Sequence, residues 1–148
     1  IGKASHPDRE RRDRLLEQAV LEARPDWVLL AGWLSLVPIP PSLAGRVLNI
    51  HPALLPDFGG AGFYGAKVHE AVAASGARYS GCTVHLADAE YDRGPVLLQS
   101  AVMLTPGDDS AAIAEKVFAA ECEAYPEALE HLIAGRVRLE NGRLHWSA

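Results

Sequence analysis

The stretch Val47-Leu48-Asn49-Ile50-His51-Pro52 is the part of the chain from which its fold is best inferred. A short apolar run bounded by turn-forming residues predicts a buried strand. Side chains alternate along a strand, so Asn49 and His51 are expected on one face. Pro52 has no N–H for a sheet and pushes the preceding residue to an extended conformation, so the strand should end there. It would present an amide donor, which can hold an oxyanion, beside an imidazole that titrates near neutral pH.

The segments on either side of this strand predict an α/β architecture. Apolar residues at helical spacing predict helices over residues 8–23, 66–75 and 109–134. Apolar runs predict further strands over residues 27–31, 82–87 and 95–99, and Asn141-Gly142 predicts a tight hairpin over 136–146. A parallel crossover needs a dozen or more residues, so the second and third of these strands should be antiparallel neighbours. We expect a Rossmann-like mixed, mainly parallel sheet flanked by helices.

Composition limits the class of protein. The chain has 148 residues, of which 49% are hydrophobic and 22% charged, as in an ordinary globular domain. Its net charge of −5 argues against broad nucleic-acid binding. No apolar run approaches the roughly 20 residues of a membrane span, so a cytoplasmic protein without membrane contact is expected. Cys82 and Cys122 lack metal-ligand spacing and are expected to be buried thiols.

Three polar residues fall at or just beyond predicted strand ends: Asn49, His51 and Asp92. Ligands of open α/β sheets bind beyond the carboxyl ends of strands, so a shared site is expected. A carboxylate beside the imidazole should raise the pKa of His51 and hold its ring in place. From the residues alone, ordinary roles stay open, because Asn49 and Asp92 are both good turn formers.

Three stretches in order extend this pattern: residues 49–56 (Asn-Ile-His-Pro-Ala-Leu-Leu-Pro), 80–85 (Ser-Gly-Cys-Thr-Val-His) and 92–99 (Asp-Arg-Gly-Pro-Val-Leu-Leu-Gln). Together they resemble the formyltransferase family that uses 10-formyltetrahydrofolate, and most closely its branch that acts on phosphoribosylglycinamide. The resemblance runs from about residue 27 to residue 133. The family's amino-terminal strand and phosphate-binding turn have no counterpart before Ile1. We therefore expect residues 1–148 to be a single formyltransferase domain lacking its amino-terminal portion.

The resemblance implies transfer of a formyl group from 10-formyltetrahydrofolate to the amine of glycinamide ribonucleotide in purine biosynthesis. It implies Asn49, His51 and Asp92 as the catalytic residues, with Gly32 and Glu121 at the substrate. The residues implied at the folate are Trp33, Leu34, Ser35, Leu36, Val37, Ala87, Asp88, Ala89, Glu90 and Tyr91. Ser35 and Cys122 stand where many relatives have an arginine and a histidine.

Several alternatives stay open. The same catalytic residues would serve a formyltetrahydrofolate hydrolase, and the chain could also be a non-catalytic folate-binding domain. His85 matches a family histidine near the site but could be only a packed support on its strand. Lys67 and His69 are expected on a solvated helix face. Neither a metal nor a nucleic-acid partner is expected, and a homodimer is an open alternative.

Overall fold

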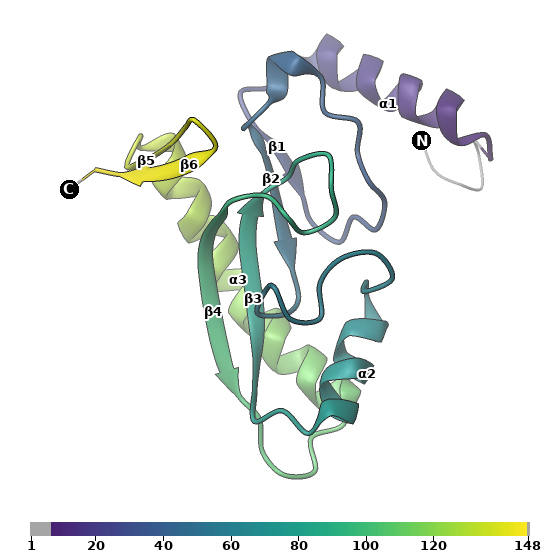
Figure 1. Ribbon diagram of the computed structural model, residues 1–148, viewed down its shortest axis with the longest axis vertical. Helices are drawn as coiled ribbons and strands as arrows, with labels where there is room; N and C mark the ends of the chain where they lie inside the picture. Colours follow the sequence, from purple (N-terminus) through teal and green to yellow (C-terminus); the bar gives the residue numbers. More distant parts are fainter. Residues whose placement is uncertain (1–6, 148) are drawn as a thin grey trace.

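A computed structural model describes residues 7–147. The first six residues and the last residue of the predicted domain lie outside the described part. A four-stranded sheet has the order β1 (Val28–Leu30), β2 (Val47–His51), β3 (Tyr79–Leu86) and β4 (Val96–Met103). The helices are α1 (Arg9–Ala23), α2 (Ala66–Ser75) and α3 (Ser110–Ile133), and η1 (Pro41–Leu43) is a short 3₁₀ turn. A separate two-stranded hairpin, β5 (Val137–Glu140) and β6 (Arg143–Trp146), closes the chain (Figure 1).

The sheet is mixed, as predicted, and β3 and β4 are antiparallel neighbours. It is not mainly parallel: β1 and β2 form a parallel pair, whereas β2 pairs with β3 in antiparallel register. The reason is the position of α2. This helix lies beyond the far end of β2, beside α3, so β3 starts where β2 finishes and runs back along it (Figure 1).

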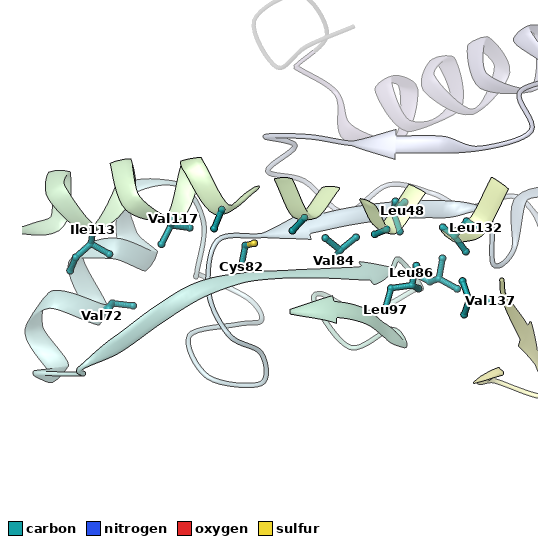
Figure 2. Packing of buried hydrophobic residues seen from close by; sticks show 13 residues of the cluster. Leu48, Val72, Cys82, Val84, Leu86, Leu97, Ile113, Val117, Leu132 and Val137 are labelled. Carbon is teal, nitrogen blue, oxygen red and sulfur yellow. The ribbon is translucent and has the colours of Figure 1, made fainter. Parts of the chain in front are cut away.

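The core lies between α3 and one face of the sheet. The predicted apolar stripe of α3 is confirmed, because Ile113, Val117 and Leu132 are buried in one cluster that also contains residues of β3 and α2: Val72, Cys82, Val84 and Leu86 (Figure 2). Helix α3 begins after Asp109, whose carboxylate accepts a hydrogen bond from the N–H of Ala112 at 2.9 Å. This packing holds the central strands against one long helix.

Turn chemistry ends the elements as the sequence predicts. Gly76 has φ +70° in the left-handed region and ends α2. Asn141 and Gly142 both have positive φ, as a type I′ hairpin turn requires. Helix α1 is also present, but its predicted apolar side is only partly buried among the described residues, and Arg12 is its one buried side chain.

Candidate active site

A cleft of about 1420 Å³ is lined by the segments that follow β1, β2 and β3 and by one side of α3. Asn49, His51 and Asp92 all line it, which confirms that the fold brings these residues together. Gly32 and Glu121 also line it, as do nine of the ten residues predicted at the folate, and Ala89 is the exception. The N–H of Leu36 donates to the hydroxyl of Tyr91 at 3.0 Å, so the two loops predicted to hold the folate are bonded to each other.

His51 and Asp92 are paired in the cleft. Nδ1 of His51 lies 3.4 Å from Oδ2 of Asp92, and their side chains are only 5% and 10% exposed. On its other side, Nε2 of His51 lies 2.8 Å from the carbonyl oxygen of Phe58. Asp92 has φ +56° in the turn between β3 and β4, so it is both a turn residue and a site residue. Both nitrogens of the imidazole therefore face oxygen atoms.

Asn49 is held by His85, which is fully buried on the neighbouring strand. The two residues are direct partners in the β2–β3 register, and Nδ2 of Asn49 lies 3.1 Å from Nε2 of His85. Nδ1 of His85 lies 3.0 Å from the carbonyl of Leu86, so in the neutral ring Nδ1 donates there and Nε2 accepts from the amide. Because the amide has two N–H donors, one is left for a ligand. His85 is therefore a site residue rather than a packed support alone.

The pKa of His51 differs from the expectation. Burial lowers it below 6.5 and outweighs the opposing effects of Asp92 and the Phe58 carbonyl. The predicted rise beside a carboxylate is therefore wrong in its net direction. Burial raises the pKa of Asp92, but the N–H of Gly60 and positive charge on the neighbouring imidazoles of His85 and His51 lower it by more, so the carboxylate stays ionised. The resting pair is therefore an ionised carboxylate beside an imidazole that gains a proton reluctantly.

Tyr125 on α3 bridges the two parallel strands, β1 and β2. Its hydroxyl lies 3.1 Å from the carbonyl of Leu30 and 2.9 Å from that of Leu48. One hydroxyl proton serves only one carbonyl at a time, so the phenol donates alternately to the two strands. Leu48 immediately precedes Asn49, so this contact fixes the strand from which the amide projects.

Two other predictions are wrong. His69 does not lie on a solvated helix face: it lines the cleft, and its Nδ1 is buried without a hydrogen-bond partner. Cys122 is exposed rather than buried, because it lies off the apolar stripe of α3 and beside the cleft. Cys82 is buried and Lys67 is exposed, as predicted.

Several cleft residues escaped the sequence reasoning, including aromatic side chains from the loop before α2 and from α3: Phe63, Tyr64, Phe118 and Tyr125. Helical periodicity identifies the buried stripe of α3 but not which of its other residues line a cleft. In the glycine-rich loop, the sequence does not distinguish a residue that lines a cleft from one in an ordinary turn.

Within residues 7–147, no group of three or more His, Cys, Asp or Glu side chains is arranged to hold a metal ion. His51, His69 and His85 thus do not form such a group. Of the helices described, none has the length and apolar character needed to cross a membrane.

Chemically, the cleft combines a free amide N–H, an imidazole and an ionised carboxylate. Such a set can stabilise a developing oxyanion and move a proton beside it. Partly apolar walls and backbone groups around it suit a flat heterocyclic ligand.

Comparisons with known proteins agree with this arrangement. The chain is 48% identical over 115 residues to an Arabidopsis thaliana protein named phosphoribosylglycinamide formyltransferase, chloroplastic, covering 76% of this chain but 39% of that protein. It superposes with a TM-score of 0.86 and 34% identity on glycinamide ribonucleotide transformylase 1 from Symbiobacterium toebii, covering 100% of this chain and 68% of that one. A formyltetrahydrofolate deformylase from Pseudomonas syringae pv. tomato gives a TM-score of 0.82 at 25% identity, covering 96% of this chain and 47% of that one.

The chain spans well under half the length of the Arabidopsis relative. The family model described as formyl transferase matches residues 2–129, which include every residue that lines the cleft, from Pro7 to Pro126. On this match, and on the fold and identities above, the chain belongs to the formyl transferase family.

Proposed function

We propose that this chain carries the catalytic centre for transfer of a formyl group from 10-formyltetrahydrofolate to the amine of glycinamide ribonucleotide. The observation that carries the proposal is the convergence of Asn49, His51 and Asp92, from two separate segments, in one cleft. Close relatives named for this activity support the choice of substrates.

The reaction begins when the amine attacks the formyl carbon, so a new C–N bond forms and the carbonyl oxygen becomes an oxyanion. The free N–H of Asn49 donates to this oxygen, while His85 holds the amide in place. Negative charge developing beside His51 raises the pKa of its imidazole, so the ring takes up a proton from solvent on the approach to the transition state and returns it when the oxyanion collapses to the new amide carbonyl.

The intermediate then breaks its bond between the formyl carbon and N10 of the folate. The attacking nitrogen loses a proton and N10 gains one, so the overall proton count is unchanged. Asp92 is ionised and touches both imidazoles, and it carries this proton directly or through a water. The cleft also holds the loops proposed for the folate, around Trp33 to Val37 and Ala87 to Tyr91. Gly32 and Glu121 are proposed to contact the ribonucleotide.

The test is consumption of 10-formyltetrahydrofolate with and without glycinamide ribonucleotide. Turnover that requires the ribonucleotide supports the proposal. Turnover without the ribonucleotide supports the hydrolase alternative, which the structural similarity to a formyltetrahydrofolate deformylase also suggests. Folate binding without turnover would support a non-catalytic domain and overturn the proposal. Asn49→Ala should then reduce turnover about 100-fold while folate binding persists, since it removes one oxyanion donor. Sizing in solution tests the homodimer alternative.

A further inference from the structure

Phe58 has an unusual backbone for a bulky residue. It lies in the loop between β2 and α2, with its ring packed against the core and edge-on to Phe63, whose centroid lies 6.3 Å away. Its φ is +53°, in the left-handed region that bulky side chains rarely adopt. In this conformation its carbonyl oxygen lies 2.8 Å from Nε2 of His51. The unusual backbone is thus in direct contact with a proposed catalytic side chain.

The same short segment also holds the partner of His51. The N–H of Gly60 donates to Oδ2 of Asp92 at 2.9 Å, and this oxygen is the one that lies 3.4 Å from Nδ1 of His51. The segment is tightly enclosed, because a Cβ added at Gly59 would lie 2.3 Å from the side chain of Leu55 and 3.5 Å from that of Asp92. Backbone atoms of residues 58–60 therefore hold the imidazole from one side and the carboxylate from the other.

A carbonyl oxygen can only accept a hydrogen bond, so the contact with Phe58 requires a proton on Nε2. In the neutral ring Nδ1 is then bare, and it is the atom that faces Asp92. We propose that Phe58 is a positioning residue: its left-handed backbone fixes the resting proton of His51 on Nε2, so the ring gains and loses its titrating proton at Nδ1, beside Asp92. The consequence for catalysis rests on the proposed function, whereas the protonation site does not.

Four groups act on the charge of His51. Asp92, from the turn after β3, and the Phe58 carbonyl favour the protonated ring, whereas His85 on β3 disfavours it. His69 on α2 is the remaining titratable neighbour and interacts unfavourably with His51 when both are charged. A hydrogen bond to a charged donor is stronger than one to a neutral donor, so the carbonyl favours proton uptake at Nδ1. Its loss should make His51 harder to protonate.

The first experiment uses the unsubstituted protein labelled with ¹⁵N-histidine. Long-range ¹H–¹⁵N spectra distinguish a protonated ring nitrogen from a bare one, and the spectrum of His51→Gln assigns the signals of His51 among those of the six histidines. The expected result is a neutral His51 with its proton on Nε2. A proton on Nδ1 in the neutral ring would overturn the proposal.

The second experiment compares Phe58→Asn with Phe58→Val. Both variants lose the aromatic ring, but asparagine adopts the left-handed region readily whereas a β-branched residue does not. The titration midpoint of His51 should be lower in the valine variant by about one pH unit, the size expected for one charge-assisted hydrogen bond. Equal midpoints in the two variants would contradict the positioning role.

The activity arm separates this inference from the proposed function. If turnover needs the protonated ring, the alkaline limb of the plot of kcat/KM against pH should shift to lower pH in Phe58→Val but not in Phe58→Asn. Absence of turnover in the unsubstituted protein would refute the proposed function, while the NMR result would still decide the protonation site.

Discussion

Gly94 offers the sharpest test of how the fold supports the site. It lies just before β4, and a Cβ built on it would be 1.7 Å from the carbonyl oxygen of Leu86. That carbonyl is the hydrogen-bond partner of Nδ1 of His85, which in turn holds Asn49. The substitution Gly94→Ala should therefore disturb both the sheet and the amide donor.

The magnitude follows from the distances. Real Cβ atoms essentially never approach within 3.0 Å, and the atom in the way is backbone, so two chain segments must separate by more than about 1 Å. This overpacking costs about 1–3 kcal/mol. The separation also strains the hydrogen bond from the N–H of Leu86 to the carbonyl of Pro95, now 2.9 Å and worth about 1 kcal/mol. We expect a total loss of about 3 kcal/mol, or about 6–12 °C in Tm.

Urea unfolding measures the loss, with Gly76→Ala as the matched control. Gly76 has φ +70° but no atom within 4 Å of an added Cβ, so its substitution tests backbone strain without overpacking, at about 1 kcal/mol. Formyl transfer, measured at a temperature where both variants are folded, should fall only in Gly94→Ala. If Gly94→Ala loses no more stability than the control, the steric reasoning is refuted.

Three further predictions concern groups around the cleft. Tyr125→Phe should lose about 1 kcal/mol in urea unfolding, because one strand carbonyl loses its donor; an unchanged unfolding midpoint would contradict the bridging role. The pKa values of His51 and His69 are lowered mainly by burial, so the unfolded chain binds more protons near pH 6.5 and stability should fall as the pH drops below that value. His51→Gln and His69→Gln should each flatten this dependence, and a slope that survives both would refute the assignment. A thiol reagent should label only Cys122 in the native chain, because Cys82 is buried and burial raises its pKa to about 11; labelling at both sites before unfolding would contradict the core described.

Local patterns predicted most of the elements. The range 66–75 for α2 is exact, and the apolar stripe of α3 is correct, because helical periodicity reports directly on a buried face. The Asn141-Gly142 turn was also predictable, since few residue pairs accept positive φ at both positions. The antiparallel direction of β3 relative to β2 was not predictable, because it depends on where α2 packs and hydrophobic periodicity does not report that position.

The side chains proposed as catalytic could be named because their spacing and order resemble those of a known family. The sequence did not predict the net pKa of His51, since the burial that lowers it arises from several separate segments. Nor did it predict that His69 lines the cleft or that Cys122 is exposed. A residue beside the apolar stripe of a helix can face solvent or a cleft with the same local pattern.

The sequence by itself determined the strand that carries Asn49 and His51, the turn that carries Asp92 and the long helix behind them, because each depends on interactions between residues close in the chain. Only the tertiary structure decided that His85 holds the amide, that Phe58 meets His51 through its carbonyl and that Tyr125 joins two strands. These contacts join residues 7 to 95 positions apart, and those of Phe58 and Tyr125 use backbone oxygens, which every residue type carries. Their position is therefore set by packing and register rather than by residue identity.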